Sequence, residues 1–133
     1  ELEIFESGMI DSALKLQKEG FLGNPLLFNF SLGFPGAMPS TAKNCLFLSE
    51  LIPSTSNWSL VQHQMDNFSL LAAALAMGAS AVRVGFEDSL NLGSGQTAQS
   101  NLELVSRIAQ LVKDLGYRIM NASETRQLLG IKG

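Results

Sequence analysis

Strand-like and helix-like segments alternate four times along this chain, and this alternation limits its possible folds more than any other feature. Short apolar runs suited to strands lie at residues 2–5, 25–32, 58–62 and 81–86. Stretches with helical spacing of apolar residues follow them at about 9–18, 40–51, 65–77 and 100–115. A polar loop is expected at 87–96 and a short tail helix at about 123–129. The pattern predicts a parallel sheet whose strands are joined by helical crossovers.

Two architectures fit four such units in 133 residues. One is a complete, small, open sheet. The other is half of a (β/α)8 barrel, because a whole barrel takes about 250 residues. Catalytic groups of barrels collect at the carboxyl ends of strands, and polar side chains lie within or beside the strands here. They are Glu1, Glu3, Asn29, Ser31, Gln62, Arg83, Glu87 and Asp88. We therefore expect residues 1–133 to form a single α/β domain that is half of a TIM barrel.

The charge, the prolines and the single cysteine exclude several classes of protein. The net charge of -3, from 12 acids and 9 bases without a basic run, argues against nucleic-acid binding. The uncharged stretch between Glu19 and Lys43 contains Pro25, Pro35 and Pro39, which would break a membrane-spanning helix. The chain has one cysteine, so it cannot form an internal disulfide, and no charged-then-apolar leader opens it. We expect a cytoplasmic protein with no membrane partner.

The strongest chemical signal is the run Arg83-Val84-Gly85-Phe86-Glu87-Asp88. A strand that alternates sides would place Arg83 on one face and both acids just past its end, so one cation and two carboxylates should converge there. A carboxylate beside a guanidinium is expected to keep a low pKa and stay charged, which suits a metal ligand or an oriented base. The structural alternative is an ordinary ion pair with an aspartate that caps the following turn.

Several separated motifs resemble the β-keto acid cleavage enzymes, the family that includes the 3-keto-5-aminohexanoate cleavage enzyme. The resemblance is carried by residues 78–90 (GASAVRVGFEDSL) and by Gly95, Ala98, Ser100-Asn101 and Glu103-Leu104-Val105. It extends through residues 1–10 (ELEIFESGMI), 28–30 (FNF), 32–39 (LGFPGAMP) and 123–130 (SETRQLLG). It covers nearly the whole chain, in the order of the C-terminal half of that family's barrel.

The resemblance implies a zinc-dependent (β/α)8 barrel that cleaves a β-keto acid with acetyl-CoA. The products would be acetoacetate and the CoA ester of the remaining fragment. By the same resemblance, Glu87 is a zinc ligand beside two histidines of an early His-x-His element. Asp88 is the base that deprotonates the substrate, and Arg83 holds and activates Asp88. An acidic residue at the start of this segment helps to hold substrate; Glu1 matches best, and Glu3 is the alternative.

The chain departs from the family pattern at the metal ligands. It has no His-x-His element, and its one histidine, His63, is expected to be an ordinary polar residue of the third strand-to-helix loop. We expect the two histidine ligands in preceding sequence that this chain does not contain. Residues 61–64 (VQHQ) and 78–81 (GASA) replace the glycines and the Gly-Gly-His that relatives usually carry, which leaves the CoA contacts open.

A second hypothesis is a non-catalytic half-barrel that serves as an interaction or assembly module. A half-barrel would expose apolar surface, so we expect a homo-oligomer or a complementary N-terminal half-barrel as partner, and an isolated chain that is inactive. Among other candidates, Gly93-Ser94-Gly95 could present backbone amides to an anion or be a flexible loop. Cys45 is expected to pack in apolar surroundings rather than to react, and Trp58 is expected in the core or at a subunit contact.

Overall fold

A computed structural model describes residues 1–131 of the chain; the last two residues of the expected domain lie outside the described part. Four strands form one parallel sheet in the order β1-β2-β3-β4. The strands are β1 (Leu2–Ile4), β2 (Leu27–Leu32), β3 (Asn57–Gln62) and β4 (Ala81–Arg83). Helices alternate with them: α1 (Gly8–Lys18), α2 (Ala42–Leu51), α3 (Ser69–Ala76) and α4 (Asn101–Asp114), followed by α5 (Ala122–Leu128). The predicted α/β class and parallel sheet are confirmed.

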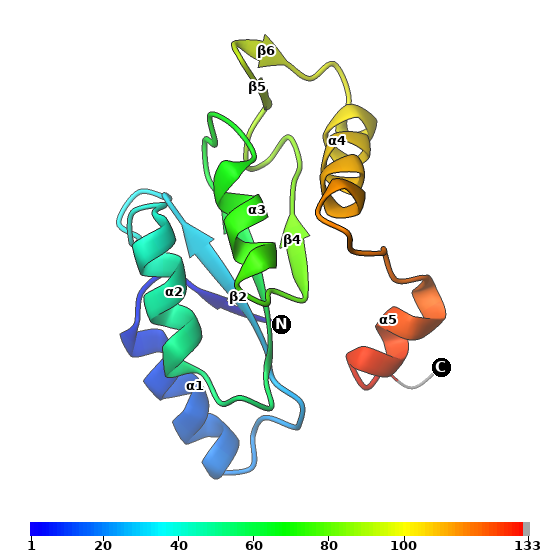
Figure 1. Cartoon of the computed structure of the whole chain (residues 1–133). Coiled ribbons are helices and arrows are strands. Elements are labelled where there is room, and N and C mark those ends of the chain that lie inside the picture. Colours follow the sequence, from blue (N-terminus) through cyan, green and yellow to red (C-terminus); the bar gives the residue numbers. More distant parts are fainter. Residues whose placement is uncertain (132–133) are drawn as a thin grey trace.

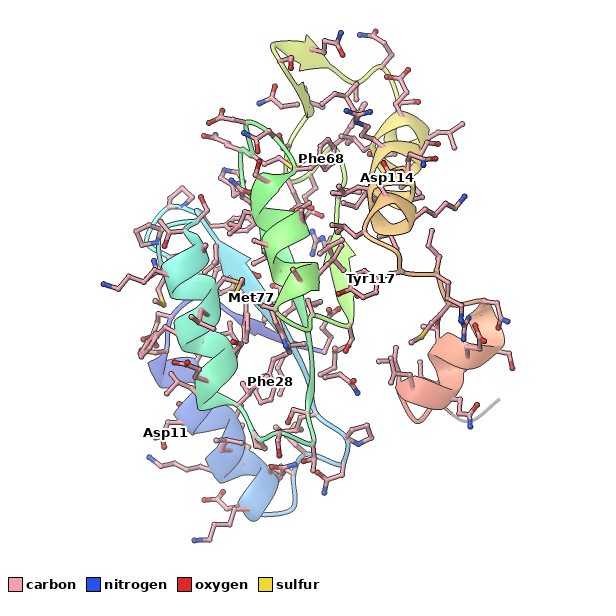
Figure 2. All side chains as sticks on the ribbon, viewed as in Figure 1. Asp11, Phe28, Phe68, Met77, Asp114 and Tyr117 are labelled. Atoms are coloured by element: carbon pink, nitrogen blue, oxygen red, sulfur yellow. The ribbon has the colours of Figure 1, made fainter. Side chains whose placement is uncertain are left out.

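The core lies between one face of the sheet and the helices. Side chains that alternate along the strands, such as Phe28, Phe30 and Leu60, are fully buried against apolar residues of α1, α2, α3 and α4. Figure 1 shows α1, α2 and α3 on the same side of the sheet, with α4 beside β4. In Figure 2, Phe28 lies in this core, whereas Asp11 projects from α1 into solvent.

The opposite face of the sheet carries polar side chains. The register places Glu3 beside Asn29 and Asn29 beside Ser59 in one row. Ser31, Val61 and Arg83 form the next row toward the carboxyl ends of the strands. We call this surface the polar face of the sheet. A sheet with sequential strand order and helices on one face only is compatible with half of a (β/α)8 barrel, since doubly wound sheets carry helices on both faces.

The third helix and the fourth strand differ most from their predicted lengths, and the loops explain why. The third helix was expected from residue 65 but begins at Ser69, because the Met65 carbonyl accepts hydrogen bonds from Ser89 Oγ (3.1 Å) and Asn91 Nδ2 (3.0 Å). The fourth strand was expected to reach residue 86 but ends at Arg83. Beyond it, the Gly85 carbonyl accepts from the backbone N–H groups of Asp88 and Ser89, which closes a turn.

The expected polar loop at 87–96 contains a small hairpin, which the sequence did not indicate. Strands β5 (Asn91–Gly93) and β6 (Gln96–Thr97) pair antiparallel. Ser94 and Gly95 link them with φ of 53° and 73°, and positive φ at both central residues is typical of a tight hairpin turn. This turn accounts for Gly95 without any bound anion, so anion binding at residues 93–95 stays a prediction.

Side-chain caps fix the starts of α4 and α5. The Ser100 hydroxyl accepts from the Glu103 backbone N–H at the start of α4, as its capping-box spacing indicates, but the Glu103 carboxylate accepts from the Gln99 N–H instead of from Ser100. Asn121 and Glu124 form a complete capping box at the start of α5.

Among the helices described, none is long and apolar enough to cross a membrane.

Candidate functional site at the carboxyl ends of the strands

Arg83 is the centre of the site. It is the last residue of β4 and lies on the polar face of the sheet, where its guanidinium binds three carboxylates. Nε and Nη2 donate to Asp88 Oδ2 (3.1 Å) and Oδ1 (3.2 Å), so this pair is two-pronged. Nη2 also donates to Glu87 Oε2 (2.7 Å), and Nη1 donates to Glu3 Oε1 (3.3 Å). The predicted convergence of Arg83 with both acids is confirmed.

The turn after β4 separates the two adjacent acids. Asp88 is 4% exposed and Glu87 is 82% exposed, although both bind Arg83. The turn is held in place by the Phe86 N–H, which donates to Asn101 Oδ1 (2.9 Å), and by the Gln64 N–H, which donates to the Asp88 carbonyl (2.8 Å). Asp88 therefore has a fixed, buried carboxylate, and Glu87 presents its carboxylate to solvent.

Burial raises the pKa of Asp88 above its usual value. The largest cause is desolvation; Arg83 acts in the opposite direction, the negative charge of Glu87 raises the pKa further, and His63 lowers it to a smaller extent. The expectation that the guanidinium would keep this carboxylate at a low pKa is wrong for Asp88, because the cost of burying the charge outweighs the ion pair. A carboxylate of raised pKa that remains hydrogen-bonded is suited to accept a proton.

The two candidate substrate-binding acids lie in different places. Glu3 extends to Arg83 and joins the cluster, a contact that sequence reasoning did not identify. Glu1 lies nearer the amino ends of the strands, where its Oε1 accepts from Ser59 Oγ at 3.3 Å. The register could have indicated the difference, because Glu3 lies on the same face as Arg83 and closer to the carboxyl edge.

Ring side chains line the carboxyl edge beside the cluster. Phe5 contacts the edge of Phe34 (5.6 Å between centroids), and Phe34 stacks on His63 (4.5 Å, 23°). His63 follows β3, as expected for a strand-to-helix loop, and its Nδ1 is buried with no hydrogen-bond partner among the described residues. Its stacking gives His63 a packing role in addition to its nearness to Asp88.

The chain alone does not fit a zinc site. Within residues 1–131, no three His, Cys, Asp or Glu side chains come together in a way that could hold a metal ion. A structural zinc has four ligands and a catalytic zinc normally has three from the protein. Glu87 is the accessible carboxylate of the cluster and could supply one of them.

Cys45 and Trp58 lie in the core, as predicted. Cys45 on α2 is fully buried, and desolvation raises the pKa of its thiol to about 11, so it is a poor nucleophile near neutral pH. Trp58 is 6% exposed and stacks on Phe30 with 5.1 Å between ring centroids. Neither residue belongs to the cluster around Arg83.

Fold and site together define an α/β protein with an arginine-oriented, buried carboxylate at the carboxyl edge of a parallel sheet. A family model for beta-keto acid cleavage enzymes matches residues 1–131, and the chain belongs to this family. The 3-keto-5-aminohexanoate cleavage enzyme of Fusobacterium nucleatum subsp. nucleatum is 42% identical over 132 residues, which are 99% of this chain and 47% of that protein. The enzyme of the same description from Acetoanaerobium sticklandii is 38% identical over 98% of this chain and 48% of its own length.

More distant relatives are named for other activities. The 3-dehydrocarnitine:acetyl-CoA trimethylamine transferase of Rhizobium meliloti is 31% identical over 97% of this chain and 42% of its own length. These relatives are β-keto acid cleavage enzymes and acetyl-CoA transferases, so the chain is a member of an enzyme family. The chain spans about half the length of the curated relatives that it matches.

Proposed function

We propose that this chain is the C-terminal half of a (β/α)8 barrel and supplies part of the active site for β-keto acid cleavage with acetyl-CoA. The observation that carries the proposal is the two-pronged contact of Arg83 with the buried Asp88 at the carboxyl edge, in a chain matched by the family over residues 1–131. The sequential sheet order, the single covered face and the share of the relatives' length support the half-barrel. Residues 1–133 would then be one domain.

The proposed reaction consumes a β-keto acid and acetyl-CoA and yields acetoacetate and the CoA ester of the remaining fragment. Relatives whose names include acetyl-CoA support the co-substrate. Their names differ in the second substrate, so the particular β-keto acid is left open. We place the protein in the cytoplasm on the basis of its single, buried thiol, with no nucleic-acid or membrane partner.

Asp88 is the proposed base, which removes a proton from the carbon next to the keto group. Its burial raises its pKa and makes it a stronger proton acceptor than an exposed aspartate, and Arg83 fixes the direction of its lone pairs through two hydrogen bonds. In the described chain the same guanidinium also bonds Glu87 and Glu3. Glu3, which joins the cluster, is better placed than Glu1 to contact substrate beside Asp88.

Glu87 is the proposed zinc ligand of this chain. Its exposed carboxylate could turn from Arg83 toward a metal, and the other two ligands would be histidines from outside this chain. A bound zinc ion would polarise the keto oxygen of the substrate. The described residues do not form such a site by themselves, so the isolated chain is proposed to be inactive.

A non-catalytic interaction module is the second candidate. It is favoured by the absence of a three-ligand metal group within residues 1–131 and by the two outer strands, β1 and β4, each of which pairs on one side only. The coding sequence upstream of Glu1 separates the candidates. Four more strand-helix units with a His-x-His element would favour the enzyme, and a start codon directly before Glu1 would favour the module.

The direct test is a cleavage assay with acetyl-CoA and a panel of β-keto acids, with acetoacetate and CoA esters measured by mass spectrometry. The chain is tested alone and after joining to the part of the Fusobacterium relative that it does not match. We expect turnover only in the joined protein. Turnover by the chain alone would contradict the proposed missing ligands, and no turnover by a folded, zinc-loaded joined protein would contradict the function.

A further inference from the structure

Two polar side chains of β2 are buried without hydrogen-bond partners. Asn29 and Ser31 are each 1% exposed, and neither the Asn29 amide nitrogen and oxygen nor the Ser31 hydroxyl bonds any group in residues 1–131. Most buried polar groups in folded proteins have a partner, and one left without costs free energy. Asn29 and Ser31 therefore reduce the stability of the described fold, and a partner from outside residues 1–131 would remove this cost.

Both side chains lie on the polar face of the sheet, next to the cluster. Asn29 is in register with Glu3 of β1, and Ser31 lies in the row that contains Arg83. The Arg83 side chain starts on β4 and binds Glu3 on β1, so it crosses in front of β2 and β3. Asn29 and Ser31 thus lie on the face of the sheet that the Arg83 side chain crosses.

The guanidinium has little capacity left for a substrate carboxylate. Four of its five N–H donors already bond to Glu3, Glu87 and Asp88, and these three acids outnumber its single positive charge. An anionic substrate at this face needs donors without added negative charge. The Asn29 Nδ2 group offers two N–H donors and Ser31 Oγ offers one, and none of the three is used within the described chain.

A ligand can reach the pair if the contact between Arg83 and Glu3 opens. At 3.3 Å this is the longest of the four bonds that Arg83 makes in the cluster, and the two side chains are 38% and 50% exposed. An exposed pair of this kind contributes little to stability. The bonds to Asp88 can remain while Nη1 moves away from Glu3.

We propose that Asn29 and Ser31 form a substrate subsite in which Nδ2 and Oγ donate hydrogen bonds to the carboxylate oxygens of the β-keto acid. The proposal rests on the proposed function for the identity of the ligand. It makes both residues substrate-binding residues, and it accounts for polar side chains at buried positions of a strand whose other face is apolar.

The kinetic test uses the joined protein described above and the variants Asn29→Leu and Ser31→Ala. Each variant should raise KM for the β-keto acid roughly 10-fold or more while KM for acetyl-CoA stays unchanged, since hydrogen bonds to a charged group are the strong ones. Neither should unfold more easily than the wild type, because each removes an unpaired buried polar group. The control is Asn57→Leu at the other end of the sheet, where Asn57 Oδ1 accepts from Ser80 Oγ (3.1 Å). It should lower stability and leave KM unchanged.

A binding measurement makes the test independent of turnover. The protein is labelled with ¹⁵N-asparagine and titrated with acetoacetate, and the Asn29 side-chain amide signals should shift while those of Asn57 do not. Wild-type kinetics in both variants, or equal KM increases for both substrates, would overturn the subsite and leave the function standing. An Asn29 shift in a protein without turnover would support the subsite and contradict the function. If neither an Asn29 shift nor turnover is observed, the subsite and the proposed function are both overturned. Ser31→Ala keeps the test valid if Asn29→Leu does not fold.

Discussion

Asp88 and Glu87 are neighbours in sequence and bind the same guanidinium, but they differ in what surrounds them. Asp88 is held by two hydrogen bonds in a buried position, whereas Glu87 has one bond and faces solvent. Exposed ion pairs contribute little to stability, so Glu87 can leave Arg83 at low cost, while Asp88 cannot leave without stranding a buried charge. This difference is the physical basis for giving the two acids separate roles.

Three substitutions test this division in the joined, active protein. Glu87→Gln should lose zinc and activity together, since a neutral amide is a poorer ligand than a carboxylate. Asp88→Asn should keep zinc and substrate binding but lose roughly 10²-fold to 10⁴-fold in rate, the usual contribution of a general base. Arg83→Lys keeps the charge but not the two-pronged geometry, and should reduce the rate more than the metal content.

Metal analysis beside steady-state kinetics checks these outcomes. Glu50→Gln is a matched control, because Glu50 is an exposed carboxylate on α2 that the cluster does not contact. It should keep both zinc content and rate. Equal zinc loss in all three cluster variants would mean that the strand end is one structural network without separate roles.

The raised pKa of Asp88 also predicts a pH dependence of stability. The folded chain binds the Asp88 proton more tightly than the unfolded chain, whose aspartate has the ordinary value of 3.8. The free energy of unfolding should therefore fall as pH rises from 3.8 through the raised folded pKa, because the folded state loses a proton that it prefers to keep. Asp88→Asn cannot titrate, so its stability relative to the wild type should increase over this window.

Urea unfolding of the metal-free chain at a series of pH values from about 3 to 7 measures this difference. Asp11→Asn, at an exposed position of α1 where Asp11 pairs with Lys15 (2.9 Å), gives the effect of removing a surface carboxylate with its ion pair. A constant difference between Asp88→Asn and the wild type across the series would show that burial does not control the Asp88 proton.

Sequence reasoning found the Arg83 cluster because its three charges lie within six residues and one strand end brings them together. It did not find the contact with Glu3, which joins strands 80 residues apart and depends on the register of the whole sheet. It also misjudged the pKa of Asp88, since burial is set by the turn after β4 and by packing from other parts of the chain. Charge pairing within the cluster can be predicted from neighbouring residues, whereas desolvation depends on residues far away in the sequence.

At the level of elements, helix starts with a strong side-chain cap were easier to predict than strand ends. The start of α4 follows from Ser100 and Glu103, and the tail helix was expected within one residue of α5. The late start of α3 reflects bonds from the loop after β4 to the Met65 carbonyl, and the early end of β4 reflects the turn that closes on the Gly85 carbonyl. The spacing of apolar residues along the sequence gives no sign of these bonds.

The cap of α4 gives a prediction for this element. Ser100→Ala should lower the stability of the chain by about 0.5–2 kcal/mol, because the Glu103 N–H loses its acceptor at the first turn. The melting temperature should fall by a few degrees, which thermal unfolding followed by circular dichroism can measure. Ser106→Ala, at an exposed mid-helix position of α4, is the control and should have little effect. An equal change in both variants would mean that the cap does not stabilise the helix.

The molecule as a whole leaves two kinds of surface uncovered. The outer strands β1 and β4 each have one neighbour, so each has a row of unpaired backbone groups. Large apolar side chains are also exposed along the C-terminal part of the chain. They include Leu102, Val105, Leu115, Tyr117, Ile119, Met120 and Ile131. In Figure 1, α5 stands apart from the sheet, and none of its residues is buried. Exposed edges and apolar patches of this kind usually mark an interface.

We therefore expect the chain on its own to self-associate, or to bind a complementary half-barrel when one is supplied. Pairing along β1 and β4 satisfies their backbone groups, and burial of the exposed apolar side chains adds a hydrophobic contribution. Light scattering coupled to gel filtration should give a mass above the 14.3 kDa of one chain that rises with concentration. Addition of the unmatched part of the Fusobacterium relative should replace this species by a defined one-to-one complex, because the complementary strands compete for the same edges. A monomer at high micromolar concentration that unfolds cooperatively would contradict the half-barrel, since a stable isolated sheet has no need of the missing strands.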